Sequence, residues 1–147
     1  MKQLITTLIF IIGFAGIAKA DTIDYWCVYY NNVKINNFNA NSELFSGKPN
    51  EITLKIKDIK ETDSLTIKYY RDWLCYGSNI MVKIENKCGN VITKGVGTES
   101  PNPIKVSVLD LLLKYETDAA KHFFAYYYEY CEYFKIERTL LFEIKLE

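Results

Sequence analysis

The stretch LTIKYY, residues 65–70, alternates apolar and polar side chains along its whole length. Leu65, Ile67 and Tyr69 fall on one side of an extended chain, which is typical of a strand with one buried face. The same alternation recurs in segments with the apolar sets Ile52, Leu54 and Ile56; Ile80, Val82 and Ile84; Ile104, Val106 and Val108; and Leu140, Phe142, Ile144 and Leu146. Repeated alternation of this kind predicts an all-β domain.

Residues that favour tight turns separate the predicted strands. Asn31-Asn32 tolerates left-handed backbone and predicts a hairpin between residues 25–30 and 33–38. The stretch 86–90, which contains Gly89, predicts a second hairpin. About seven to nine short strands are expected, which favours an antiparallel β-sandwich, immunoglobulin-like or related.

Three further segments complete the predicted fold. The loop expected over Gly95–Pro103 contains glycines and prolines, and residues 122–134 are expected to pair with 140–146 across Lys135–Arg138. One short helix is predicted near residues 109–115, beginning at Ser107 with Asp110 three residues later. The alternative is one long helix over residues 109–128, because Ala119 and Ala120 have high helix propensity.

The first twenty residues have the pattern of a secretory signal peptide. Lys2 is followed by a short apolar run, and the segment ends in Ala18-Lys19-Ala20. The run is about 14 residues long, too short to cross a bilayer. We expect residues 1–20 to be cleaved and residues 21–147 to fold as a single domain in the periplasm or outside the cell, without a membrane span.

The charge of the mature chain argues against nucleic acid as a partner. The full sequence has 18 basic and 18 acidic residues, and removing Lys2 and Lys19 with the leader leaves a net charge near −2. The chain also has no run of Lys or Arg that could follow a phosphate backbone.

The four cysteines, Cys27, Cys75, Cys88 and Cys131, are an even number in a chain predicted to be exported. Their wide spacing argues against zinc ribbons and redox CxxC motifs, so disulfides are expected. Cys75 and Cys88 would lie at opposite ends of the strand over residues 80–85, beyond the reach of one disulfide. Cys27 and Cys131 are therefore expected to pair each with one of the central two, unless residues 71–79 loop back along the strand. The alternative is that some of the four cysteines stay free and buried.

Most catalytic chemistry finds no support in the sequence. His122 is the single histidine, which leaves little basis for a Ser-His-Asp arrangement or a zinc site, and no metal or other cofactor is expected. Glu129, Glu132, Glu137 and Glu143 lie on or near neighbouring predicted strands, so a carboxylate-based glycan or cell-wall hydrolase is the enzyme alternative.

The segment FFAYYYEYCEYF, residues 123–134, is the most unusual local feature. In a strand, Tyr126, Tyr128 and Tyr130 share one face, while Phe123, Tyr127 and Cys131 share the other, which we expect to be core. Tyrosine combines apolar area with a polar tip and is frequent at binding surfaces. These three tyrosines and Trp73 are the candidate ligand contacts.

These observations together predict an exported, non-enzymatic binding module or interaction protein. Its ligand would be a protein or a glycan held through exposed aromatic side chains. A secreted inhibitor or immunity-type protein, acting through the loop over Gly95–Pro103, is a further alternative.

Overall fold

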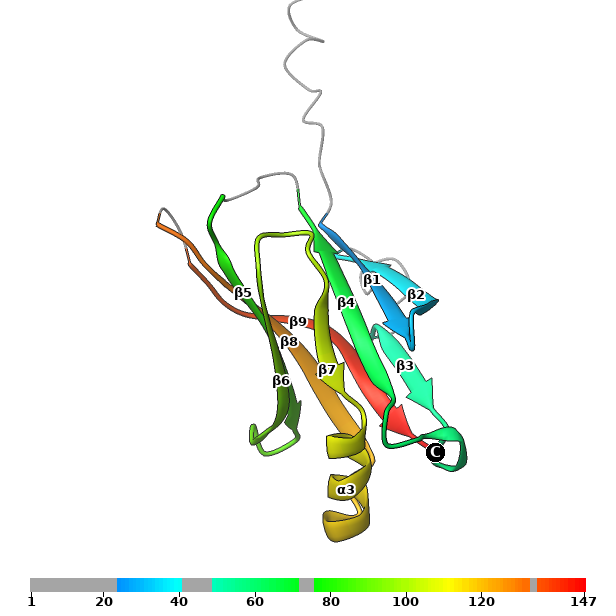
Figure 1. Cartoon of the computed structure of the whole chain (residues 1–147). Helices are drawn as coiled ribbons and strands as arrows, with labels where there is room; N and C mark the ends of the chain where they lie inside the picture. The colour runs from blue at the N-terminus through cyan, green and yellow to red at the C-terminus, as the bar shows by residue number, and fades with distance from the viewer. Residues whose placement is uncertain (1–23, 41–48, 72–75, 133–134) are drawn as a thin grey trace, which may run out of the picture.

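In the part of the chain that the structure describes, the protein has a mostly β fold with two sheets, one short α-helix and one 3-10 turn (Figure 1). The computed structural model describes residues 24–40, 49–71, 76–132 and 135–147, so the predicted leader, Trp73 and Cys75 lie outside the described residues. In chain order the elements are β1 (Tyr25–Tyr30), β2 (Val33–Asn39), β3 (Glu51–Leu54), the 3-10 helix η1 (Ile56–Asp58), β4 (Ser64–Tyr70), β5 (Asn79–Asn86), β6 (Val91–Thr98), β7 (Ile104–Ser107), the helix α3 (Leu109–Asp118), β8 (His122–Tyr130) and β9 (Lys135–Leu146).

The four-stranded sheet has the order β2-β1-β4-β7, and all its neighbours are antiparallel. The predicted hairpin between β1 and β2 is confirmed. Asn31 and Asn32 both have positive φ, 47° and 69°, as a two-residue hairpin turn with the right twist requires.

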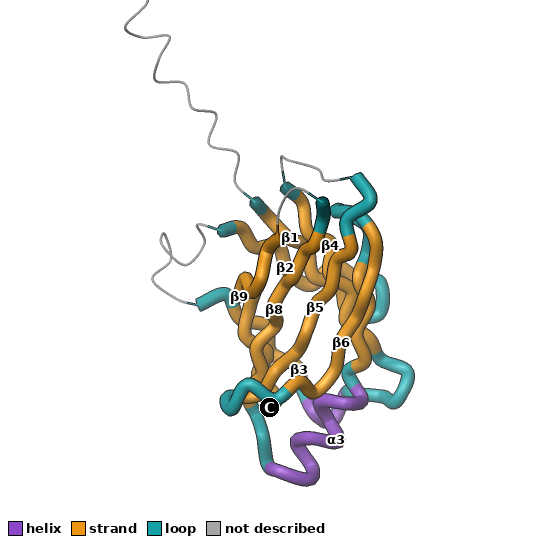
Figure 2. The backbone as a smooth tube through the Cα atoms, turned by 90° about the vertical axis from the view of Figure 1, so that its left-hand side faces the viewer, coloured by secondary structure: helices purple, strands orange, loops and turns teal. Residues whose placement is uncertain are grey.

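The five-stranded sheet has the order β3-β9-β8-β5-β6 and is mixed. The second predicted hairpin, β5 with β6, is confirmed, and Gly89 in its turn has a φ of 79°. The expectation of purely antiparallel sheets is wrong at one edge, because β3 runs parallel to β9 and pairs Ile52 with Ile144. Alternation along a strand defines its buried face but not the direction of its neighbour. Figure 2 shows β9, β8, β5 and β6 side by side.

One hydrophobic core contains side chains from both sheets. Phe38 of β2 stacks on Phe142 of β9 with ring centroids 5.8 Å apart. Tyr69 of β4 stacks on Tyr127 of β8 at 4.3 Å. Such aromatic contacts tie the inner faces of the two sheets together and add to the apolar area that they bury.

Helix α3 lies at one end of the sheets (Figures 1 and 2). The short helix is confirmed but runs to Asp118, three residues beyond the predicted end, and Ala119 then adopts left-handed backbone with a φ of 53°. Ser107 is not its cap, since Val108 takes that position without a side-chain hydrogen bond. The alternative of one long helix over residues 109–128 is wrong, because β8 begins at His122.

Two predicted connections are partly strand. Lys135–Arg138 begins β9, so the turn between β8 and β9 falls earlier than predicted. A register shift near Tyr126 also breaks the alternation in β9, with the result that Leu140 is 41% exposed while Leu141 is buried. A bulge of this kind moves an extra side chain to the other face and cannot be read from one strand alone.

The expected loop over Gly95–Pro103 starts only after Thr98, because Gly95–Thr98 is the second half of β6. Gly95 lies where β6 of one sheet meets β7 of the other. A Cβ atom at this position would stand 2.4 Å from the Lys105 carbonyl oxygen and 2.7 Å from Ile104 Cγ2. Glycine is therefore required here by the close approach of the two strands.

Asp63 connects several parts of the four-stranded sheet. Its buried carboxylate accepts hydrogen bonds from the Tyr30 hydroxyl, from Asn31 Nδ2 at 2.7 Å and from the Lys60 amide at 2.8 Å. These bonds, the one from Tyr30 first, hold the pKa of Asp63 below its ordinary value. The carboxylate therefore fixes the β1–β2 turn against the segment that enters β4.

Candidate functional site

The predicted row of tyrosines lies on the outer face of the five-stranded sheet. As predicted, Phe123 and Tyr127 on the alternate face belong to the core. The row is unevenly exposed, because Tyr130 is 38% exposed, Tyr126 is half-buried and Tyr128 is only 7% exposed. Two of the three tyrosines therefore remain accessible.

Neighbouring strands surround this row with apolar and cationic side chains. Across to β5, Tyr128 is opposite Met81 and Tyr126 is opposite Lys83. On the other side, Arg138 of β9 reaches over the row. We call the surface formed by Met81, Lys83, Tyr126, Tyr128, Tyr130 and Arg138 the tyrosine face.

One buried carboxylate organises the tyrosine face. Glu85 Oε1 accepts a hydrogen bond of 3.2 Å from the Tyr128 hydroxyl, and Glu85 Oε2 accepts one of 2.7 Å from Arg138 Nη2. Burial, followed by the charge of Glu85, raises the pKa of Tyr128, so its hydroxyl stays a proton donor at neutral pH. The hydrogen bond to Glu85 also raises the pKa of Arg138.

Cations cover two of the aromatic rings. Lys83 Nζ lies 4.5 Å from the centroid of the Tyr128 ring, and Arg138 Cζ lies 4.1 Å from that of Tyr126. Both distances are within the range of cation–π attraction. One face of each ring is therefore already in contact with a cation of the protein itself.

The sequence predicted the tyrosines of this surface but not its cations. Alternation in β5 does place Met81, Lys83 and Glu85 on one side, opposite its apolar residues. What the sequence could not provide is that β5 pairs with β8, or that β9 brings Arg138 to the same place. Trp73, the fourth predicted contact, lies outside the described residues.

Two of the carboxylates proposed for a hydrolase, Glu129 and Glu143, lie on opposite faces of the five-stranded sheet. Glu129 is fully buried on the core side of β8, where its Oε2 accepts hydrogen bonds of 2.9 Å from Arg71 Nη1 and 3.0 Å from the Tyr127 hydroxyl. Glu143 lies on the opposite face, beside Phe124. Glu132 is exposed beyond the end of β8, and the side chain of Glu137 lies outside the described part of the chain.

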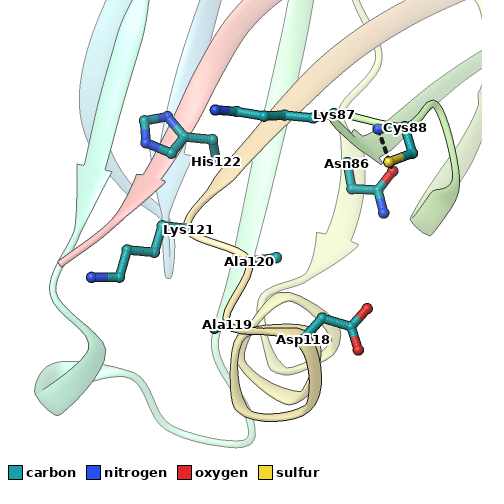
Figure 3. A pocket seen from close by; sticks show the side chains of 8 residues that line it. All are labelled: Asn86, Lys87, Cys88, Asp118, Ala119, Ala120, Lys121 and His122. Carbon is teal, nitrogen blue, oxygen red and sulfur yellow. Dashed lines mark hydrogen bonds between the residues drawn. The ribbon is translucent and has the colours of Figure 1, made fainter.

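His122 lies at the other end of β8 and is half-buried. Its Nδ1 contacts Glu143 Oε1 on β9, a pairing that fixes the ring. It also lines a shallow cleft of about 450 Å³ between the β5–β6 turn and the end of α3. Figure 3 shows the Cys88 thiol, the Asp118 carboxylate and the His122 imidazole spread around this opening rather than converging on one point.

The predicted cysteine pairing is wrong for two of the four residues. Cys27 and Cys88 are free thiols, the first buried and the second exposed. The cross-strand neighbours of Cys27 are Asn37 and Lys68, so no cysteine of the described strands lies opposite it. Cys131 is disulfide-bonded, and Cys75 lies outside the described residues.

The described residues contain neither a metal-binding cluster nor a helix long and apolar enough to span a membrane. Within residues 24–40, 49–71, 76–132 and 135–147, no group of three or more His, Cys, Asp and Glu side chains is placed to hold a metal ion. The same ranges contain no helix of the length and apolar character that a bilayer crossing needs.

Comparison with known proteins adds no family. No protein-family model matches the sequence, and no curated protein sequence matches it either. A functional proposal must therefore come from the residues of the chain itself.

Proposed function

We propose that this protein is an exported, non-enzymatic binding module that contacts a protein partner through its tyrosine face. Its two sheets would form a β-sandwich of the immunoglobulin-like or a related type, supported by the core that both sheets share. The signal-like residues 1–20 support a location in the periplasm or outside the cell.

The composition of the tyrosine face carries the proposal. Tyrosine, methionine and arginine are enriched in protein–protein interfaces, and all three meet here on one face of the five-stranded sheet. Beside Met81 on the edge strand β6, Val96 is 71% exposed and extends the apolar area. Tyr130, Val96 and Leu140, which lies opposite Tyr126 on β9, are accessible apolar side chains that a partner would cover.

A protein fits this surface better than a glycan does. A sugar ring stacks on an open aromatic face, but the Tyr126 and Tyr128 rings each have a cation on one side. A protein surface instead uses the edges of the rings, the apolar side chains around them and the fixed guanidinium of Arg138.

The alternative functions have weaker support. A carboxylate-based hydrolase needs two acids in one cleft, whereas Glu129 and Glu143 lie on opposite faces of the five-stranded sheet. An inhibitor or immunity-type protein acting through the loop over Gly95–Pro103 would have only residues 99–103 available, because β6 extends to Thr98.

The test is affinity capture from the native envelope and culture medium with the purified mature protein as bait. We expect a protein captured by the wild type to bind about 10- to 30-fold more weakly to the double variant Val96→Asp/Tyr130→Ala, the size of an interface hot spot. Leu113→Ala, which removes an exposed leucine of α3 instead, should bind like the wild type. Equal capture by all three proteins would refute the proposed surface.

A further inference from the structure

The outer face of the four-stranded sheet is a second, chemically different surface. Cross-strand pairing places Lys34, Tyr29, Thr66 and Lys105 in one row across β2, β1, β4 and β7. The next row contains Asn37 and Lys68, on either side of Cys27. We call the surface formed by Tyr29, Lys34, Asn37, Thr66, Lys68 and Lys105 the lysine face.

The strands of the four-stranded sheet contain three lysines and no aspartate or glutamate. Two described acids lie just outside these strands, and both already accept hydrogen bonds. Asp63 binds Tyr30 and Asn31, and Asp24 Oδ2 accepts one of 2.7 Å from the Tyr69 hydroxyl. The lysine face is thus locally positive on a chain whose mature net charge is near −2.

The lysines of this face are spaced along it rather than clustered. Lys34 and Lys105 are both exposed and lie three strands apart, about 14 Å at the usual spacing of strands. Lys68 lies between them, with its Nζ 5.5 Å from the centroid of the Tyr29 ring. Thr66 lies next to Lys105 in the first row, and Asn37 lies two strands from Lys68 in the second row.

We propose that the lysine face binds a linear acidic polysaccharide that carries carboxylates on its sugar rings. Such a chain carries carboxylates and neutral hydroxyls on its sugar rings, which matches lysines interspersed with hydroxyl, amide and tyrosine groups. Lysine is depleted in protein–protein interfaces, so an acidic protein fits this composition less well. This inference goes beyond the proposed function, because it concerns the other sheet and a different ligand class.

The test measures binding of polygalacturonate to the mature protein at 50 mM salt. We expect measurable binding that weakens about tenfold or more by 200 mM salt, since three cations release counterions when the complex forms. The double variant Lys34→Glu/Lys105→Glu should lose at least tenfold in affinity. Both lysines are exposed, so the variant should fold, and its dichroism spectrum and melting curve check that it does.

The control variant is Lys57→Glu/Lys87→Glu, which makes the same change in net charge at exposed lysines outside the lysine face. It should bind polygalacturonate within about threefold of the wild type. Fully methyl-esterified polygalacturonate, which lacks the negative charges, should not bind.

Three outcomes would overturn the proposal. The first is that polygalacturonate does not bind at 50 mM salt. The second is that both double variants lose the same affinity for polygalacturonate, which would indicate an effect of net charge alone. The third is that poly-L-glutamate or duplex DNA binds as tightly as polygalacturonate. This result would mean that the lysine face binds polyanions in general and has no preference for a glycan. None of these results bears on capture through the tyrosine face.

Discussion

The outer faces of the two sheets use similar side chains but differ in what balances their charge. The strands of the five-stranded sheet contain five basic and five acidic residues, whereas those of the four-stranded sheet contain three lysines and no acid. On the tyrosine face, Glu85 holds Arg138, and Lys83 lies on the Tyr128 ring. On the lysine face, Lys34 and Lys105 are exposed and only Lys68 lies near a ring.

This difference shows how pairing decides what a surface can bind. A cation that already has a carboxylate and a ring beside it is a fixed part of the surface, and its interaction with a partner adds little net charge attraction. A cation without a neighbouring acid keeps its field for a ligand. The tyrosine face therefore suits shape-dependent contact with a protein, and the lysine face suits attraction of a polyanion.

The largest expected effect tests the charge pair that joins the two sheets. Arg71 follows β4 of the four-stranded sheet and pairs at 2.9 Å with Glu129, which is fully buried in β8 of the five-stranded sheet. Arg71→Met leaves the glutamate charge buried without this partner. We expect a loss of about 3–5 kcal/mol in the free energy of unfolding, measured by urea denaturation at pH 7.

A second variant separates lost charge pairing from lost packing. Adding Glu129→Gln to Arg71→Met removes the isolated charge and should recover about 1–3 kcal/mol of the loss. An additive double variant would mean that the two side chains do not interact.

The next largest effect concerns the place where β6 and β7 join the sheets at their edges. Gly95→Ala would put its Cβ against the Lys105 carbonyl oxygen and should cost about 2–3 kcal/mol. Gly97→Ala, two residues along the same strand, meets only the Ile80 and Ile104 side chains at 3.4 Å or more and should cost less than about 1 kcal/mol. Similar urea midpoints for the two variants would contradict this close approach of the sheets.

A smaller effect comes from Asp63 at the edge of the four-stranded sheet. Its pKa is below the ordinary value in the folded protein, so it stabilises the fold at neutral pH, and this contribution is lost as the pH falls below about 4. Asp63→Asn should cost about 2 kcal/mol at pH 7, because an amide replaces a charged acceptor of three hydrogen bonds.

The pH dependence distinguishes this role from simple packing. Thermal melts of the wild type between pH 7 and pH 3 should show a fall in stability that Asp63→Asn largely lacks. Asp58→Asn, at an exposed acid of η1, should leave the wild-type pH dependence in place. Parallel curves for the wild type and Asp63→Asn would exclude Asp63 as the source of the pH dependence.

Much of the fold followed from local patterns in the sequence. Alternation at Leu65, Ile67 and Tyr69 predicted their burial, and Asn31-Asn32 predicted a turn that the backbone indeed makes with positive φ. These features depend on neighbours within a few residues. The parallel pairing of β3 with β9 was not predictable in this way, because its residues are about ninety positions apart.

The candidate surfaces also combine residues that the local sequence identifies with residues that only distant strand pairing brings together. Tyr126 and Tyr130 were found from their place in one strand, but Arg138 joins them only through the register shift between β8 and β9. The lysine face was missed altogether, since it draws Lys34, Lys68 and Lys105 from three separate strands. No single segment of the sequence shows that the strands of the four-stranded sheet contain no acidic residue, while those of the five-stranded sheet contain five.

The smallest expected effects concern the two free thiols, one in β1 and one in the β5–β6 turn. Cys27 of β1 donates a hydrogen bond of 3.4 Å to Asn37 Oδ1, and Cys88 is exposed in the turn between β5 and β6. Serine keeps the hydrogen bond of the first and the solvent contact of the second. Cys27→Ser and Cys88→Ser should therefore each change the free energy of unfolding by about 0.5 kcal/mol or less.

Cys131→Ser is the matched comparison, because it removes a disulfide and should cost about 2–4 kcal/mol. Cys75 is the expected partner. Asn79 at the start of β5 pairs with Tyr130 at the end of β8. The segment before Asn79 and the segment after Tyr130 therefore leave the sheet at the same end. Alkylation of the denatured, unreduced mature protein should then modify two thiols, at Cys27 and Cys88. Four modified thiols, in protein recovered from outside the cytosol, would contradict both the disulfide and the oxidising compartment that the first twenty residues predict.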